Sequence, residues 1–344
     1  MTGAVLPKVR ERGGRRDEAP PQGRGSQSLR TFRRSGWARR EARAGAMLVT
    51  PAFLFVAVFV LFPLGFAIYI SLTNWPLVGS YHFVGAQNYA ALGSDPIFIH
   101  SVIFTLIYTA IVTVPILVVG YGLATLVRSN RFGSTVFRTI FFIPFVVGLA
   151  TESFILVVEL QPNSGAINFV LSGVGIIKSS TAWLVNTDLA LAAVCILVVW
   201  YASGLTMLLL MAGMQGIPRE VYEAAEVDGA SWWARERRIT IPLLRPVIAL
   251  SLIISVIGSF LAFNQFDILT QGGPGTSTDT VVMWIYQMAF VRFHIGAATA
   301  MGIVLVIVVG LISVVQFVLL RDPTEARGRA RLSRPPTGAR RETA

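Results

Sequence analysis

Apolar residues fill six long runs of this chain, and the polar and charged residues are gathered between them. Asp, Glu, Lys and Arg are all absent between Arg43 and Asp95, between Asp95 and Arg128, and from Leu189 to Pro218. About 20 helical residues cross a hydrocarbon core of roughly 30 Å, so uncharged runs of this length indicate membrane-spanning helices. We expect six spans, at about residues 47–72, 101–127, 137–160, 187–214, 246–268 and 296–320.

The composition supports the same interpretation. Of the 344 residues, 54% are hydrophobic and only 14% are charged, whereas an ordinary soluble domain carries about 25% charged residues. A soluble protein would have to bury several helices of this length completely, and one chain offers too little covering surface. The sequence therefore predicts an all-α, polytopic membrane protein with six transmembrane helices.

Basic residues gather in alternate connections. Of the 29 Lys and Arg residues, 12 lie in residues 1–43, three in 128–138, five in 215–245 and seven in 321–344. Positive residues are retained in the cytoplasm, so both termini and both of these loops are expected there. We expect a disordered basic tail over 1–44, a permease domain over 45–320 and a basic C-terminal tail over 321–344. The net charge of +11 then reflects the orientation of the chain in the membrane and attraction to anionic lipid, and it does not indicate nucleic-acid binding.

A further apolar stretch, residues 280–294, competes for a place as a seventh span. It is short and contains Arg292, and a seventh span would move the C-terminal arginines outside. We interpret it as an interfacial or re-entrant helix on the outer side of the membrane.

The loop 215–245 carries clear helix signals. Pro218 suits a first helical turn, where its missing N–H is not needed, and Gly229 can adopt the left-handed conformation that ends a helix. Ser231 can cap a second helix, which Pro242 would end. The pattern predicts two short helices joined at a glycine corner, with the charge of Glu223 and Asp228 offered to a partner.

The loop resembles the EAA signature of permease subunits of binding-protein-dependent ABC importers. The residues that match the signature are Glu223, Ala224, Ala225, Gly229, Ile239 and Pro242; Ile241 replaces the usual Leu. The resemblance implies a MetI-like permease fold and implies that these helices fit a groove on a separate ATP-hydrolysing subunit. A DNA-binding helix-turn-helix is the competing interpretation, but the loop carries five basic and five acidic residues and lies between two spans. A purely structural loop is the other alternative.

A second resemblance concerns the substrate class. The segment Leu269 to Thr280, with its Gly-Gly-Pro-Gly turn, resembles a loop of carbohydrate-uptake permeases of the maltose and glycerol-3-phosphate type. The segment that begins at Phe83-Val84-Gly85 and continues to Asn88-Tyr89 resembles the same group. By themselves, the glycines of the first segment require only a tight turn.

Catalytic and cofactor motifs are missing from the sequence. The nearest approach to a phosphate-binding loop, residues 173–179, has Ile177 where glycine must precede Lys178. One cysteine, Cys195, and three scattered histidines suggest no disulfide or metal site. We expect a protein that is not an enzyme and holds no cofactor or metal, with ATP and Mg²⁺ bound by the partner ATPase.

Polar residues inside membrane spans are costly and are therefore candidates for substrate contact. The fifth predicted span carries Phe260, Asn264 and Asp267 on one helical face, with Gln265 beside it. The third span carries Glu152 and Glu159, and the fourth carries Trp200 and Tyr201. The substrate-pathway candidates are Glu152, Tyr201, Phe260, Asn264, Gln265 and Asp267; hydrogen bonding between helices is the rival role.

The sequence thus predicts the permease subunit of an ATP-driven importer, for a sugar or oligosaccharide. Its expected partners are a second permease subunit, two ATPase subunits, an extracytoplasmic solute-binding protein and membrane lipid. The alternatives are the same machine for glycerol-3-phosphate, an amino acid or a peptide, or a secondary transporter without ATPase partners, which would need inverted repeats. A membrane-anchored scaffold or sensor would leave the EAA spacing unexplained.

Overall fold

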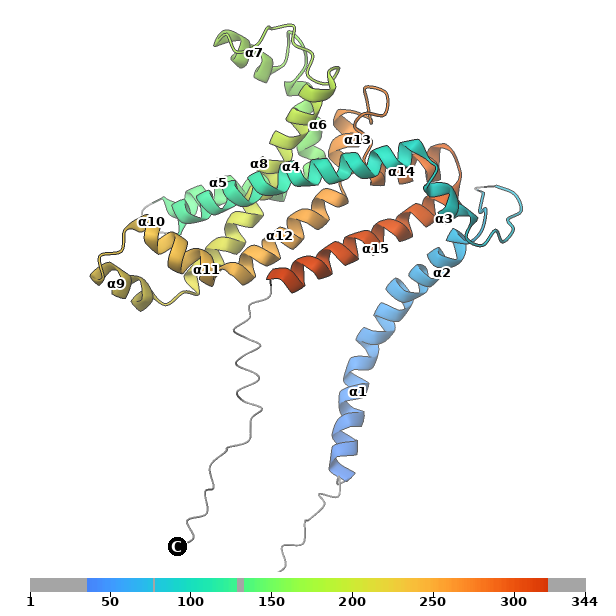
Figure 1. Ribbon diagram of the computed structural model, residues 1–344, viewed down its shortest axis with the longest axis horizontal. Coiled ribbons are helices and arrows are strands. Elements are labelled where there is room, and N and C mark those ends of the chain that lie inside the picture. Colours follow the sequence, from blue (N-terminus) through green and yellow to red (C-terminus); the bar gives the residue numbers. More distant parts are fainter. Residues whose placement is uncertain (1–35, 77, 129–132, 321–344) are drawn as a thin grey trace, which may run out of the picture. The chain divides into compact units, whose positions relative to one another are not determined.

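A computed structural model describes residues 36–76, 78–128 and 133–320 (Figure 1). The predicted tails therefore lie outside the described residues, except for residues 36–44. These nine residues belong to helix α1 (Gly36–Val56). The segment contains Ala, Arg and Glu, which are good helix formers.

The chain divides into two compact units, Met1–Leu61 and Phe62–Ala344. The described part of the first unit consists of α1 and a π-helical turn, η1 (Ala57–Leu61). Its apolar side chains, Phe55 and Phe59 among them, are almost all exposed. Such a surface suits lipid rather than water. The first candidate span runs over Gly45–Ser71, which agrees with the predicted 47–72.

The described part of the second unit is mostly helical. Its elements are α2 (Phe62–Ser71), α3 (Gln87–Leu92), α4 (Pro96–Val127), α5 (Ser134–Val147), α6 (Leu149–Glu159), α7 (Ala166–Gly173), α8 (Thr187–Gln215), α9 (Arg219–Val227), α10 (Trp232–Arg235), η2 (Glu236–Thr240), α11 (Ile241–Leu243), α12 (Arg245–Phe260), α13 (Asn264–Leu269), α14 (Val281–Tyr286), η3 (Gln287–Val291) and α15 (Ile295–Leu320). Pairing of β type in the described residues is limited to two isolated bridges. The predicted all-α class is confirmed.

Helices α4 and α8 form the centre of this unit. They pack against each other, and α12 packs against both. The main apolar core is built around Tyr108 and Val112 of α4, Val194 and Leu197 of α8, and Phe266. Gly120 of α4 allows close approach, because a Cβ atom there would lie 2.6 Å from Cγ2 of Thr206. Small residues at helix contacts are typical of membrane proteins.

The predicted third span is not one straight helix. Helices α5 and α6 meet at an angle of 93° at Gly148. Gly148 has φ 93° and ψ 137°, a conformation that side-chain-bearing residues rarely adopt. The glycine therefore breaks a run that is apolar enough to be continuous, and the prediction of one helix over 137–160 is corrected to a bent pair.

The predicted fifth span is also interrupted. Helix α12 ends at Phe260, before the predicted end at 268, and residues 261–263 are not helical. A bend of 70° between the segments Trp232–Leu243 and Arg245–Phe260 lies just before the predicted span. The carbonyl of Ala262 accepts a hydrogen bond from the Thr280 hydroxyl at 2.7 Å. This bond satisfies a backbone group that the break removes from the helix.

Among the described residues, four helices are long and apolar enough to cross a membrane alone, and the number rises to six if each bent pair is one span. Three of the four are α4, α8 and α15, close to the predicted 101–127, 187–214 and 296–320. The rival seventh span is an apolar helix of only 11 residues, Val281–Val291. It is too short to span, as predicted.

Candidate functional site

Two short helices meet at a glycine corner in the loop 215–245, as predicted. Helix α9 begins directly after Pro218, and Gly229 follows it with φ 73°. Helix α10 begins after Ser231, whose hydroxyl accepts a hydrogen bond from the Ala234 N–H at 3.3 Å. Figure 1 shows α9, α10 and α11 together at one end of the second unit.

Pro242 does not end the second helix, and that prediction is corrected. The helical backbone continues through Pro242 to Leu243, and the Leu244 N–H donates to the Thr240 carbonyl at 2.9 Å. The π-helical turn η2 precedes Pro242, so the proline stands in the first turn of α11. Proline is tolerated there because its missing N–H is not needed.

Half of the six residues that match the EAA signature are exposed, and so is the neighbouring Asp228. Glu223, Ala224, Asp228 and Gly229 are exposed, and none of the residues of α9 is buried. A Cβ atom on Gly229 would meet nothing within 4 Å. Ala225, Ile239 and Pro242 are half-buried. The corner therefore presents an open face of small and acidic residues.

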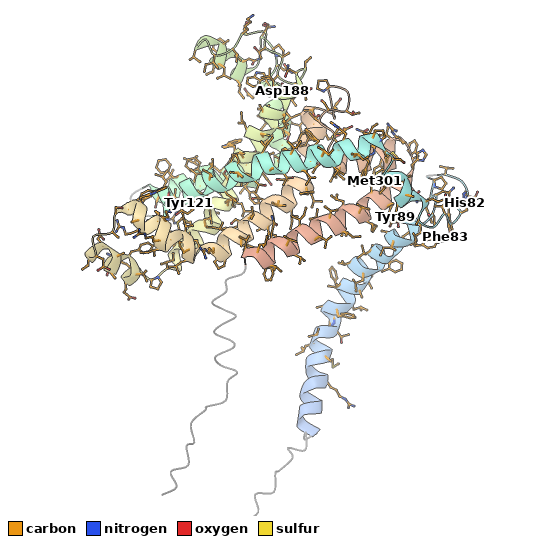
Figure 2. All side chains as sticks on the ribbon, in the orientation of Figure 1. His82, Phe83, Tyr89, Tyr121, Asp188 and Met301 are labelled. Carbon is orange, nitrogen blue, oxygen red and sulfur yellow. The ribbon has the colours of Figure 1, made fainter. Side chains whose placement is uncertain are left out.

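A buried carboxylate behind this face was missed by the sequence reasoning. Glu236 of η2 is 1% exposed, its Oε1 lies 2.9 Å from Nη2 of Arg128, and its Oε2 accepts 2.5 Å from the hydroxyl of Tyr121. Figure 2 labels Tyr121 on α4, toward the end of the unit that holds α9 to α11. The sequence gives no local sign that Glu236 is buried, because Arg237 and Arg238 follow it in a polar loop.

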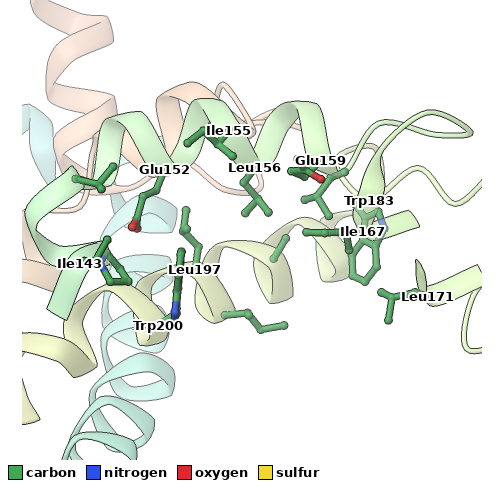
Figure 3. A pocket seen from close by; sticks show the side chains of 15 residues that line it. Ile143, Glu152, Ile155, Leu156, Glu159, Ile167, Leu171, Trp183, Leu197 and Trp200 are labelled. Carbon is green, nitrogen blue, oxygen red and sulfur yellow. The ribbon is translucent and has the colours of Figure 1, made fainter. Parts of the chain in front are cut away.

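A cavity of about 550 Å³ lies between α5, α6, α7 and α8. Apolar side chains form most of its wall, and it also contains Glu152, Glu159, Trp183 and Trp200. Figure 3 shows Glu152 pointing from α6 toward Trp200 and Leu197 of α8. The structure thus brings together the two predicted carboxylates of the third span and the tryptophan of the fourth. Few polar groups in an apolar wall are typical of small-molecule sites.

The candidates of the fifth predicted span do not share one helical face. Phe260 ends α12 and is buried, whereas Asn264 begins α13 and is exposed. Gln265 is buried and donates to the Tyr108 hydroxyl at 3.2 Å, and Asp267 is half-buried. The break at residues 261–263 removes the shared face that a continuous helix would give.

Tyr201, the remaining candidate, is half-buried on α8. Its ring packs against that of Phe145, with ring centroids 5.2 Å apart. It lies one residue after Trp200, yet it does not line the cavity.

The Gly-Gly-Pro segment forms a tight turn between α13 and α14. Gly272 and Gly275 have φ 81° and 66°, and the Thr278 hydroxyl donates to the Gly273 carbonyl at 2.9 Å. Asp279 follows, fully buried, and accepts from Nε2 of Gln287 at 3.2 Å. Burial raises the pKa of the Asp279 carboxyl to about 6, against the opposing effects of that hydrogen bond and of nearby basic groups.

The Phe83–Tyr89 segment is bound to the end of α2. Nδ2 of Asn88 donates to the carbonyls of Ser71 and Thr73, each at 2.8 Å, and the Tyr89 hydroxyl lies 2.7 Å from the Ser71 hydroxyl. Figure 2 shows Phe83 and Tyr89 near each other at this place. The segment therefore fixes how the chain leaves α2.

The long apolar helices and the exposed helical corner between them define a membrane permease. The chain belongs to the family described as binding-protein-dependent transport system inner membrane component, which matches residues 103–322. It is thus a permease component of an ABC importer, and such components are not enzymes.

Relatives with related names cover most of the chain. A lactose transport system permease protein of Rhizobium radiobacter is 33% identical over 86% of this chain and 99% of its own length. A diacetylchitobiose uptake system permease protein of Streptomyces coelicolor is 32% identical over 87% and 88%. A sulfoquinovosyl glycerol transport system permease protein of Agrobacterium fabrum is 32% identical over 75% and 84%.

A solved structure shares the fold. A chain of a bacterial alginate ABC transporter, crystallised with an alginate pentasaccharide-bound periplasmic protein, superposes with a TM-score of 0.73. The two chains are 22% identical over 83% of this chain and 96% of that one. At this identity the likeness establishes the fold, which is the MetI-like permease fold that the EAA resemblance implied.

Proposed function

We propose that this chain is the permease subunit of an importer for a sugar or oligosaccharide, and that it forms half of the translocation pathway. Relatives whose names refer to lactose and diacetylchitobiose uptake support the substrate class. The Gly-Gly-Pro turn, which the sequence links to carbohydrate permeases, is consistent with it. No inverted repeat supports a secondary transporter, and family membership favours the ABC importer.

The observation that carries the coupling role is the open corner at Gly229. A groove on an ATPase subunit needs an element with a free face. Helix α9 and its glycine corner offer one, since none of the residues of α9 is buried and a Cβ atom on Gly229 would meet nothing within 4 Å. Ala224 permits close approach, and Glu223 and Asp228 provide charge. When the ATPase subunits bind ATP and close, this corner and the attached helices would move. The pathway would then open alternately to the two sides of the membrane.

The remaining partners follow from the same assignment. A second permease subunit completes the pathway, two ATPase subunits bind at the cytoplasmic face, and a solute-binding protein delivers the substrate outside. Both termini and the loop 215–245 face the cytoplasm, as the basic residues indicate. The chain itself holds no nucleotide or metal, because ATP and Mg²⁺ belong to the ATPase.

The substrate pathway is proposed to pass Glu152, Tyr201, Asn264 and Asp267, with Phe260 and Gln265 as supporting residues. Asn264 and Glu152 are the strongest candidates. Asn264 is exposed at a helix break, and Glu152 projects into an apolar cavity. Saccharide hydroxyls suit amide and carboxylate groups, and the ring faces of a saccharide suit aromatic side chains.

The variant Gly229→Val tests the coupling role. A β-branched residue at φ 73° is strained, so the corner should be displaced and the ATPase subunits should be lost from the purified complex. Gly175→Val is a matched control, since Gly175 has φ 76° and also meets nothing within 4 Å. Membrane insertion of both variants is checked by fluorescence of a C-terminal fusion. Retention of the ATPase subunits by Gly229→Val at the control level would refute the docking role.

The substrate class is tested with the complete importer in proteoliposomes. A panel of labelled di- and oligosaccharides is compared with glycerol-3-phosphate, amino acids and short peptides. ATP-dependent uptake of a saccharide alone is expected. Uptake of an amino acid or a peptide, with no saccharide transported, would overturn the substrate class and leave the permease assignment in place.

A further inference from the structure

One buried carboxylate joins the loop 215–245 to the end of α4. We propose that Glu236, with Arg128 and Tyr121, forms a latch that makes the loop and α4 move as one body during the transport cycle. The proposal rests on the proposed coupling function and adds the residue through which the movement reaches α4. Glu236 is here a positioning residue, since it touches neither substrate nor nucleotide.

Both oxygens of the Glu236 carboxylate face side chains of α4. Arg128, at the C-terminal end of α4, lies 2.9 Å from Oε1 of Glu236, and Tyr121, two turns earlier, donates to Oε2 at 2.5 Å. The carboxylate is therefore held to α4 by one ion pair at Oε1 and one hydrogen bond at Oε2, and Oε1 has no hydrogen bond beside its ion pair in the described residues. A buried carboxylate is costly without such partners, so displacement of the loop from α4 would leave this charge uncompensated.

The first helix of the loop is fastened at the same point. The guanidinium of Arg128 lies 5.7 Å from the centroid of the Tyr222 ring on α9. The Tyr222 hydroxyl lies 3.1 Å from the hydroxyl of Thr240, which follows Glu236 by one turn. The latch thus connects both arms of the glycine corner to α4, and a force on either arm reaches the same helix.

The other ion pairs of the loop lack this character. Arg219 and Glu223 pair at 2.7 Å within α9, and Arg235 and Glu226 pair at 3.4 Å between the arms. In both pairs the carboxylate is exposed to water, and exposed pairs contribute little. Among the ion pairs of the described residues, only Glu236 with Arg128 joins the loop to a membrane helix.

Helix α4 extends the connection to the opposite end of the unit. It is 32 residues long, and Asp95 caps its first turn. Oδ2 of Asp95 accepts from the indole N–H of Trp284 at 3.2 Å, and the Thr105 hydroxyl oxygen accepts from the Val281 N–H at 3.0 Å. Movement of the loop would therefore shift the helix that supports α14 and the Gly-Gly-Pro turn. This is a contiguous physical link between two distant segments.

The test measures whether the loop and α4 move together. Spin labels are placed at Val227→Cys and Leu126→Cys, both exposed positions outside the latch, in a Cys195→Ser background. Distances are measured by pulsed electron resonance in the complete importer, without nucleotide and with MgATP and orthovanadate. The wild type should keep one narrow distance distribution in both states. Glu236→Gln should give a second, longer-distance population in the trapped state.

Three further variants make the result specific. Exchange of the charges, Arg128→Glu with Glu236→Arg, should restore the single distribution, which a role in packing alone would not do. Glu226→Gln, which breaks an exposed pair of the same loop, should behave as wild type. If Glu236→Gln fails to assemble, Tyr121→Phe removes a single hydroxyl and should broaden the trapped distribution.

The outcomes separate the latch from the coupling function. The latch would be overturned if Glu236→Gln gave the same distance distribution as the wild type in the vanadate-trapped state. Where Glu236→Gln does not assemble, the same result for Tyr121→Phe would overturn it. So would a charge exchange that behaves like Glu236→Gln. In both cases the ATPase subunits still co-purify, and the proposed function stands. Absence of ATPase subunits from the wild-type complex would instead overturn the proposed function, and the latch with it.

Discussion

Three carboxylates in the described part of this chain are withdrawn from water, and their surroundings give them different roles. Glu236 faces an arginine and a tyrosine, and Asp279 faces Gln287. Each of the three has one buried oxygen without a hydrogen-bond partner in the described residues. Glu152 is 5% exposed and projects into an apolar cavity. Unlike the other two, its side chain has neither an ion pair nor a hydrogen bond among those residues. An unsatisfied acid inside a membrane segment is a functional candidate by default. Glu152 is therefore the carboxylate that most needs a substrate or a partner subunit.

Asp279 gives a prediction about pH. Its folded-state pKa of about 6 lies above the ordinary value of 3.8, so between these two pH values the folded state binds more protons than the unfolded state. Stability should therefore fall as pH rises from about 4 to about 6 and then level off. Asp279→Asn should remove this part of the slope. The measurement is thermal unfolding of the detergent-solubilised protein from pH 4 to 8.

The difference between Asp279→Asn and the wild type isolates this group from the other titrating residues. The variant keeps an oxygen that can accept from Gln287, and its advantage should appear above pH 6. One pKa unit corresponds to about 1.4 kcal/mol, so the gain should be on the order of 1–3 kcal/mol. Parallel pH curves of the two proteins would contradict the prediction.

Two neighbouring side chains separate substrate contact from structural support. Asn264 is exposed at the start of α13, whereas Gln265 is buried and hydrogen-bonded to Tyr108. Asn264→Ala should lower the apparent affinity for the transported saccharide about 5-fold to 30-fold, the effect of about 1–2 kcal/mol for one lost hydrogen bond. The complex should assemble normally. The measurement is uptake by proteoliposomes over a range of saccharide concentrations.

Gln265→Ala is the contrasting variant. It leaves the Tyr108 hydroxyl without its partner in the core, so the unfolding temperature should drop. Saccharide affinity of the protein that remains folded should change less than in Asn264→Ala. Unchanged uptake kinetics in Asn264→Ala would remove α13 from the substrate pathway.

At the scale of elements, hydropathy located the spans but not their breaks. The bounds of α4, α8 and α15 lie within about five residues of the predicted ones, because an uncharged run of this length has few alternatives in a membrane. The 93° bend at Gly148 was missed, because hydropathy is averaged over many residues and one glycine hardly changes it. The break after Phe260 depends on a hydrogen bond from Thr280, 18 residues away from its acceptor.

The functional residues also divide into those with a local sequence signal and those that are brought together only by tertiary packing. The glycine corner at Gly229 and the cap at Ser231 were predictable because their signals are local. The latch was not predictable from the sequence, since Tyr121 and Glu236 are 115 residues apart and meet only because α4 packs beside the loop. A charged residue followed by two arginines in a polar loop gives no local indication that it is buried.

Packing between helices gives a prediction with a control on the same helix. A Cβ atom at Gly120 would lie 2.6 Å from Thr206 on α8, whereas a Cβ atom at Gly122 would meet nothing within 4 Å. Gly120→Ala should therefore separate α4 from α8 and cost about 1–3 kcal/mol. Gly122→Ala should be neutral or should stabilise the helix by up to about 1 kcal/mol.

Chemical unfolding in mixed micelles, followed by tryptophan fluorescence, measures both glycine variants. The expected order of stability is Gly122→Ala, wild type, Gly120→Ala. Equal stability of the two variants would show that the contact between α4 and α8 accommodates an added methyl group at little cost. The close packing inferred at the centre of the unit would then be wrong.

At the scale of the whole molecule, the exposed apolar surface and the charges give complementary information. Large apolar side chains remain exposed along α1, α4 and α15, which a membrane and a second permease subunit would cover. The charges set the orientation in that membrane. Four segments hold 27 of the 29 basic residues, and by the proposed orientation all four face the cytoplasm.

Two exposed valines allow the orientation to be tested directly. Val227 is the last residue of the coupling helix α9 and is 88% exposed, and Val185 precedes α8 and is 73% exposed. In a Cys195→Ser background, each is replaced by cysteine and treated with a membrane-impermeant maleimide in right-side-out vesicles. Val185→Cys should react at once, whereas Val227→Cys should react only after the membrane is permeabilised. Since one span separates the two sites, the opposite pattern would invert the chain and place the glycine corner where no ATPase can reach it.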